Sequence, residues 1–312
     1  MKTRSPAPLI ARSDPLCRAA RKKESSVACQ ASPRGGVVGV EVAGDRVLLG
    51  GQAVTVLRGE LVDGQADGAG SRYTNAVAFR DRLVATLRAV APVLEEPGVL
   101  IVGSEVPNLL EPGVAATLVV SQDVDVGVPV ERHAAVKRRL DALRGLRQSP
   151  EERSVWVPDD PGLLEVNFVG MDSRRDPMDT SLLEDERLPL LVFGPLALLQ
   201  PAEPVSVEGL RVPVPRPAGL TLEKLVTDRT GEKGERDLLV ALGLLMLARP
   251  QDMDELVATY RTLSPELRHT VCSNLTVLSL MKAHAQMPDP EMERARVAAL
   301  LARLDAAQKA AT

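Results

Sequence analysis

The spacing of hydrophobic positions predicts alternating helices and strands in the middle of the chain. Apolar residues recur at helical spacing over 75–96, and this helix is expected to end before Pro97. Two short apolar runs, GVLIVG at 98–103 and LLEVNFVG at 163–170, are typical of buried strands. DVDVGV at 123–128 alternates acidic and apolar residues at its start, which indicates a strand buried on one face.

The flanking segments have different patterns. VVGVEVA and VLLGG surround a Gly-Asp turn signal and predict β-structure over 37–61, whereas 64–71 reads as a linker rich in Gly, Ala and Asp. After residue 215 the helical period continues to the end of the chain. Further expected elements are a basic helix at 130–146, a hairpin at 207–215, and helices at 217–228, 235–249, 251–262, 265–284 and 289–310.

These elements predict an α/β (α+β) fold class, with a small mixed sheet flanked by helices and followed by a helical C-terminal region. The expected parts of the chain are a disordered basic arm at 1–36, a small β segment at 37–74, a mixed core at 75–215 and a helical domain at 216–312.

Composition narrows the function classes. Aromatic residues make up 2% of the 312 residues, which argues against a protein that stacks single-stranded bases on aromatic platforms. The net charge of −4 provides no overall attraction to nucleic acid or to anionic membranes. No apolar run reaches the ~18 residues of a membrane span. The cysteines Cys17, Cys29 and Cys272 lack metal-ligand spacing, so reduced thiols and a cytoplasmic location are expected.

The stretch with the clearest chemistry is the pair Asp123 and Asp125. Side chains at positions i and i+2 of a strand share one face, so these carboxylates are expected to point together while Val124 faces the core. Two such carboxylates repel each other unless a cation lies between them, and Mg²⁺ prefers oxygen ligands. Upstream, the small Gly103-Ser104 turn would let backbone N–H groups approach a triphosphate.

An acidic pair alone also fits an exposed polar strand face, but the apolar strand and Gly-Ser turn before it favour a metal site. With these motifs the chain resembles the nucleotidyltransferase superfamily related to DNA polymerase β. The resemblance extends to bacterial members that include toxins of abortive-infection systems, through VPVPRPAGLTLEKLVTDRTGEKGERDLLVALGLL at 212–245. This second block places Lys224 and Asp237 on the family's Lys and Asp positions. The resemblance covers about 75–262.

The resemblance implies a third acid on a neighbouring strand, and here the sequence departs from the family. The usual Val-Asp maps onto Val166-Asn167, and an Asn can bind a metal through its amide oxygen but adds no charge. Glu165 shares the strand face with Asn167 and is the alternative ligand. The implied metal ligands are Asp123, Asp125 and either Glu165 or Asn167.

The implied activity is transfer of an NMP from an NTP to an acceptor hydroxyl at a two-ion Mg²⁺ site. Gly103, Ser104 and Lys224 would bind the nucleotide, and Asp237 would orient Lys224 or a base. Acceptors in related families include tRNA and other RNA, proteins and small molecules, and toxin members imply a cognate antitoxin. The alternative is a catalytically weakened member that acts as a binding or regulatory module.

Other polar residues carry weaker signals. Lys233 and Arg236 are phosphate candidates or solvated surface residues. Basic residues after the Asp pair would form either a rim for RNA phosphates or a solvated helix face; they are Arg132, Lys137, Arg138 and Arg139. Trp156 and Phe168 are expected in the core, and His133, His269 and His284 on the surface or in helix packing.

Overall fold

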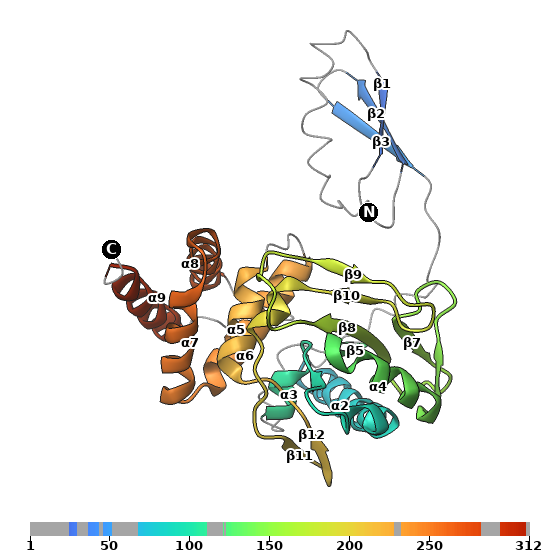
Figure 1. The fold of residues 1–312 in the computed structure, drawn as a ribbon. Coiled ribbons are helices and arrows are strands. Elements are labelled where there is room, and N and C mark those ends of the chain that lie inside the picture. The colour runs from blue at the N-terminus through green and yellow to red at the C-terminus, as the bar shows by residue number, and fades with distance from the viewer. Residues whose placement is uncertain are drawn as a thin grey trace. The chain divides into compact units, whose positions relative to one another are not determined.

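The structure is a computed structural model with two compact units, Met1–Gln65 and Ala66–Thr312 (Figure 1). The residues whose backbone it describes are 25–29, 37–43, 46–51, 68–110, 121, 123–227, 232–281 and 294–309. No helix among these residues is both long and apolar enough to cross a bilayer.

The described part of the first unit is a three-stranded antiparallel sheet. It consists of β1 (Ser25–Cys29), β2 (Val37–Ala43) and β3 (Arg46–Gly51), in that order. The two strands within 37–51 confirm that part of the predicted β-structure, and 52–61 lies outside the described residues. Strand β1 falls within the segment expected to be a disordered arm. It pairs antiparallel with the next strand, β2, from Ser25↔Glu41 to Cys29↔Val37, and the composition of the segment does not reveal this pairing.

The second unit is built on a mixed sheet with the order β4-β5-β8-β10-β9. Strands β5 and β8 pair in parallel, and so do β8 and β10, whereas the outer strands β4 and β9 run antiparallel to their neighbours. The strands are β4 (Leu100–Ile101), β5 (Asp123–Pro129), β8 (Glu165–Met171), β9 (Ser181–Leu183) and β10 (Leu190–Val192).

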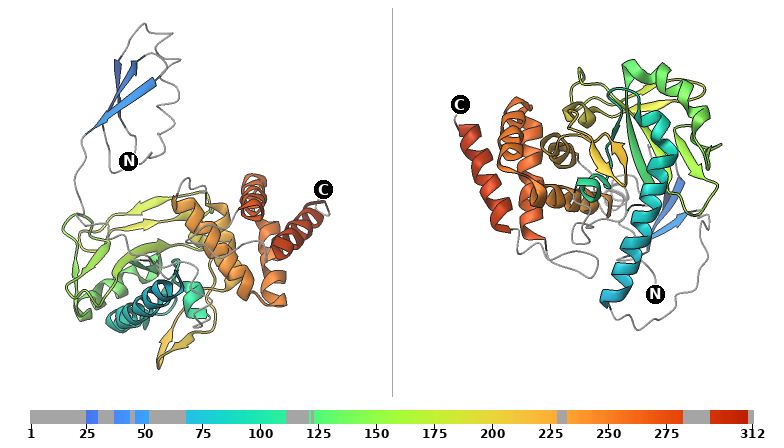
Figure 2. Two further views of the ribbon diagram at one scale, coloured as in Figure 1. Left: turned by 180° about the vertical axis from the view of Figure 1, so that it is seen from behind. Right: turned by 90° about the horizontal axis from the view of Figure 1, so that it is seen from below.

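Two hairpins and several helices surround this sheet. The hairpin of β6 (Leu146–Gln148) and β7 (Val155–Pro158) continues it through antiparallel pairing of β7 with β8. Strands β11 (Val205–Val207) and β12 (Leu210–Val212) form a separate two-stranded sheet. Around them lie α2 (Gly68–Leu94), α3 (Val106–Leu110), α4 (His133–Arg139) and the 3₁₀ helices Val130–Arg132, Leu140–Ala142 and Gly194–Leu198 (Figure 2).

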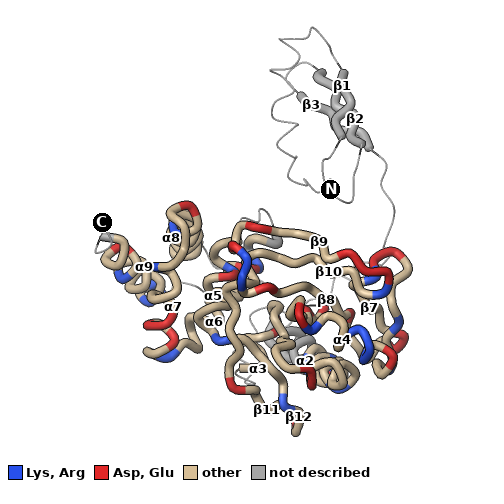
Figure 3. Tube along the Cα trace, in the orientation of Figure 1, with Lys and Arg blue, Asp and Glu red and all other residues tan. Residues whose placement is uncertain are grey.

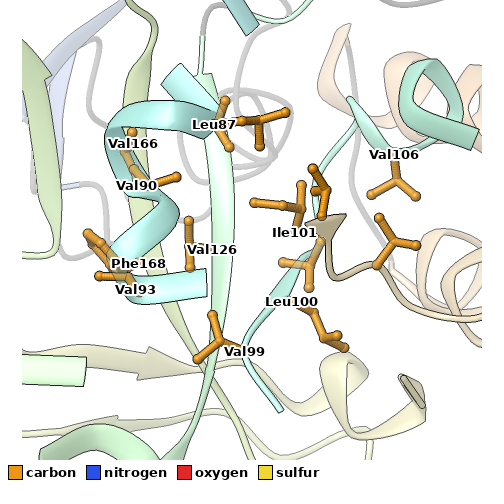
Figure 4. Packing of buried hydrophobic residues seen from close by; sticks show 14 of the residues in the cluster. Leu87, Val90, Val93, Val99, Leu100, Ile101, Val106, Val126, Val166 and Phe168 are labelled. Atoms are coloured by element: carbon orange, nitrogen blue, oxygen red, sulfur yellow. The ribbon is translucent and has the colours of Figure 1, made fainter. Parts of the chain in front are cut away.

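Helix α2 covers one face of the sheet with an apolar stripe. Leu87, Val90 and Val93 recur every three residues and lie fully buried against that face (Figure 4). Val126 of β5 and Phe168 of β8 point into the same cluster. Burying such a side chain stabilises the fold by about 1.5–3 kcal/mol each, so α2 stays attached to the sheet. Because side chains alternate along a strand, Asp123 and Asp125 of β5 point to the opposite face.

In the described part of the C-terminal region, five helices bury a second cluster rich in Leu (Figure 1). Together with the mixed sheet and its flanking helices, they confirm the predicted fold class. The helices are α5 (Pro217–Val226), α6 (Glu232–Leu247), α7 (Pro250–Thr262), α8 (Pro265–Leu280) and α9 (Arg294–Lys309).

Several predicted boundaries were wrong. Helix α2 begins at Gly68, so 68–71 is helical and not a linker. The predicted helix at 130–146 is shorter: its helical turns end at Ala142, Leu143 is extended, and Leu146 pairs with Pro158 in the hairpin after Gly145 turns the chain with a positive φ of 71°. The core placement of Trp156 and Phe168 is confirmed by an edge-to-face contact with ring centroids 6.5 Å apart.

Candidate functional site

Four polar side chains share the sheet face opposite α2, here named the acidic face. Asp123 and Asp125 are half-buried on it, while Val124 between them is fully buried on the other side. The parallel register places Glu165 beside Asp123 and Asn167 beside Asp125. The prediction that Asp123 and Asp125 share one strand face, opposite Val124, is therefore confirmed.

The Asn167 amide lies between the two aspartates. Its Nδ2 donates to Asp123 Oδ2 at 3.0 Å and to Asp125 Oδ1 at 3.2 Å. One oxygen from each carboxylate thus converges on a single atom. The two ends of an amide are assigned from such contacts, and rotation by half a turn would present the carbonyl oxygen to the same place.

Glu165 occupies a different position from Asn167. It is half-buried beside Asp123. Its pKa is raised above the ordinary value, first by burial and then by the negative charges of Asp123 and Glu152. A raised pKa makes the Glu165 carboxylate a stronger base than an ordinary glutamate at the edge of the acidic pair.

Glu105 is an acid at this site that the sequence patterns did not single out. It follows the Gly-Ser turn directly, is 1% exposed, and its Oε1 accepts a hydrogen bond from the Asp125 backbone N–H at 2.9 Å. Burial raises the pKa of Glu105 to about 8, and the charges of Asp125 and Asp123 add to that shift. The available signal was an acidic residue placed directly before the apolar run VPNLL.

Gly103 packs closely against two carboxyl groups of the site. A Cβ at this position would lie 2.6 Å from Glu105 Oε1 and 2.7 Å from Asp125 Oδ2, with Glu105 Oε2 closer still. The absence of a side chain lets the two carboxyl groups pack against the backbone. Ser104 is half-buried at the same turn, just before α3.

Ser121 and Arg236 connect the acidic face to the helical region. Ser121 is buried, and its hydroxyl donates a short hydrogen bond to Asp123 Oδ1. Arg236 is exposed on α6, and its Nη2 lies 3.4 Å from Ser121 Oγ. The fold therefore brings a cation from 113 residues downstream of Asp123 to that side of the acidic pair. Ser121 was not identified from the sequence, since a serine before a strand is common.

The structure brings Lys224 and Asp237 together, as their matching positions implied. Lys224 Nζ lies 3.7 Å from Asp237 Oδ1 and 2.9 Å from Glu223 Oε2, and all three side chains are buried. Burial lowers the pKa of Lys224, but Glu223, Asp237 and Asp125 together outweigh it and the net shift is upward. Lys224 is therefore a charged group close to the acidic face, held between two carboxylates.

Two of the four basic residues that follow the Asp pair are in ion pairs. Lys137 pairs with Asp185 at 2.5 Å, and Arg139 pairs with Glu95 and Glu96, which follow the end of α2. Arg132 and Arg138 are exposed. Positions of both signs are interspersed along the described chain (Figure 3). The ion pairs of Lys137 and Arg139 are what a solvated helix face would have, while Arg132 and Arg138 remain exposed to a partner.

The remaining polar residues have separate positions. His133 is buried, with Nε2 2.8 Å from Leu188 O, and His269 is exposed, which agrees with packing and surface roles. The side chains of Lys233 and His284 lie outside the described part of the structure.

Comparison with known protein families, curated proteins and solved structures identifies no relative of this chain. Within the described residues, no group of three or more His, Cys, Asp or Glu side chains is arranged to hold a metal ion. The chemistry of the site is therefore inferred from the acidic face itself.

Proposed function

We propose that this chain is a Mg²⁺-dependent nucleotidyltransferase that transfers an NMP from an NTP to an acceptor hydroxyl. The observation that supports this most directly is the convergence of Asp123 Oδ2 and Asp125 Oδ1 on one atom of Asn167. A cation in place of the amide hydrogens would relieve the same repulsion between the carboxylates.

The donor set fits such an ion. Mg²⁺ is usually held by one or two carboxylates while substrate phosphates and waters complete its shell, so a cage of three protein acids is not required. Asp123 and Asp125 would hold the ion, and Asn167 would join through its carbonyl oxygen after rotation of the amide. When bound, the ion neutralises triphosphate charge and polarises the phosphoryl group.

The protein's own groups fit the remaining parts of the reaction. Glu165, beside Asp123 and with a raised pKa, would accept the proton of the acceptor hydroxyl as the hydroxyl oxygen bonds to the α-phosphorus and pyrophosphate leaves. Arg236 is exposed beside Ser121 and would contact departing phosphates. Lys224, held between Glu223 and Asp237, adds positive charge near Asp125.

A second candidate, a catalytically weakened binding or regulatory module, is favoured by one observation. Asn167, and not an acid, contacts both aspartates. Such a module would bind a metal–nucleotide without transfer. In the enzyme the acceptor would be RNA such as tRNA, a protein or a small molecule; a toxin-type role with a cognate antitoxin and a cytoplasmic location belong to the same proposal.

The test is label transfer by the purified full chain. It is incubated with Mg²⁺ and each α-labelled NTP in the presence of total tRNA or cell extract. The enzyme requires transfer that the double variant Asp123→Ala, Asp125→Ala abolishes. A matched control is Asp159→Ala, Asp160→Ala, which changes two exposed aspartates in the turn before β8 and should keep transfer.

The outcomes separate the two candidates. Metal-dependent NTP binding without transfer to any acceptor would favour the binding module. Absence of both transfer and metal-dependent NTP binding would overturn both proposals.

A further inference from the structure

The Glu105 carboxyl group is buried, and only one of its two oxygens accepts a hydrogen bond. Its Oε1 accepts the Asp125 backbone N–H at 2.9 Å. Its Oε2 has no hydrogen-bond partner among the described residues, although the side chain is only 1% exposed. Buried polar atoms are nearly always paired, so an unpaired carboxylate oxygen calls for a partner such as a bound ion or water.

This oxygen is directed to the same space as an oxygen of Asp125. Around the point where a Gly103 Cβ would lie, Glu105 Oε1 is at 2.6 Å and Asp125 Oδ2 at 2.7 Å, and Glu105 Oε2 is nearer. The other Asp125 oxygen, Oδ1, faces Asn167 on the acidic face. The two oxygens of Asp125 therefore face two different neighbours, Asn167 and Glu105.

Such an arrangement is suited to a bridging carboxylate. Two carboxyl groups packed side by side repel each other unless one is protonated or a positive charge lies between them, and a divalent cation can take the place of the proton. Mg²⁺ and Mn²⁺ are hard cations that prefer carboxylate oxygens. In two-ion sites for phosphoryl transfer, the ions lie about 3.5–4 Å apart, a separation that one carboxylate can bridge.

We propose that Glu105 is a metal ligand and that, with Asp125 Oδ2, it holds a second cation behind the acidic face. The first cation lies between Asp123 and Asp125, and water or phosphate oxygens complete both shells. Glu105 then supplies the third carboxylate that β8 lacks at Asn167. This inference rests on the proposed function, which supplies the nucleotide whose phosphates would bind the cations. Cation binding itself can be measured without a nucleotide.

The test is Mn²⁺ titration of the full-length protein, with free Mn²⁺ followed by electron paramagnetic resonance. Glu105→Gln keeps the side-chain volume and an acceptor for the Asp125 N–H but removes the charge. We expect one of two Mn²⁺ sites to be lost or weakened at least tenfold. Asp252→Asn is the matched control, because Asp252 is also a buried acid but caps α7 through Arg249. It should bind Mn²⁺ as the wild type does.

The wild-type protein provides a second measurement in case Glu105→Gln does not fold. An anomalous scattering peak from Mn²⁺ in soaked crystals, within coordination distance of Glu105 Oε2 and Asp125 Oδ2, would support the site. Mn²⁺ bound to Asp125 without Glu105, or a Glu105→Gln titration identical to wild type, would overturn the inference and leave the proposed function intact. Loss of Mn²⁺ in Glu105→Gln, in a protein that transfers no nucleotide, would support the site and refute the enzyme.

Discussion

Replacing Gly103 by Ala tests whether the close approach of its backbone to the carboxyl groups matters. The new Cβ would lie 2.6 Å from Glu105 Oε1 and 2.7 Å from Asp125 Oδ2, whereas ordinary contact begins near 3.4 Å. The two oxygens must therefore retreat by about 0.7–0.8 Å, an overpacking of the kind that typically costs about 1–3 kcal/mol of stability.

The functional effect should exceed the effect on stability. Displacing a catalytic group by about 1 Å can lower a rate roughly 100-fold. The Asp125 backbone N–H donates a hydrogen bond to Glu105 Oε1, and the Asp125 carboxylate accepts one from Asn167. A shift of the Asp125 carboxylate would therefore disturb its convergence with Asp123 on the Asn167 amide. We expect Gly103→Ala to weaken Mn²⁺ binding at least tenfold while the protein still folds.

The assay compares Mn²⁺ titration and thermal unfolding of Gly103→Ala with Gly162→Ala. Gly162 lies in an exposed turn, and its added Cβ would come no closer than 3.2 Å to Asp160 Oδ1, so this variant should match the wild type in both measurements. Wild-type Mn²⁺ affinity in folded Gly103→Ala would refute the reasoning, because the carboxyl groups would then have room that the structure denies them.

Two further predictions concern buried charges. The raised pKa of Glu105 means that folding favours its protonated form, so its contribution to stability is complete below about pH 4.5 and is lost as pH rises toward 8. Without divalent cations, the free energy of unfolding of wild type minus that of Glu105→Gln should fall by a few kcal/mol, about 1.4 per unit of pKa shift, between pH 5 and 9, measured by denaturant titration; a constant difference would contradict this. Lys224→Met should destabilise the fold by about 3–5 kcal/mol, because it removes the buried cation that pairs with Glu223 and Asp237. Arg211→Met, at an exposed position of β12, should change the midpoint of thermal unfolding little. Equal midpoints for the two variants would exclude a stabilising role for the Lys224 ion pairs.

The parts of this protein that the sequence determined by itself are those set by local periodicity. Helical spacing within 75–96 and after 215 located the helices, because a helix buries residues three and four apart. Alternation in DVDVGV placed Asp123 and Asp125 on one face and Val124 on the other, because side chains of a strand alternate.

Only the tertiary structure decided which distant residues complete the site. The register of β5 on β8 places Asn167 beside Asp125 and Glu165 beside Asp123. The local sequences of two separate strands do not show how the strands align, so this register came only from the structure. Packing at Gly103 brings Glu105 against Asp125, and α6 brings Arg236 to Ser121. These contacts join residues 20 to 115 positions apart, so they depend on how elements pack and not on any local pattern.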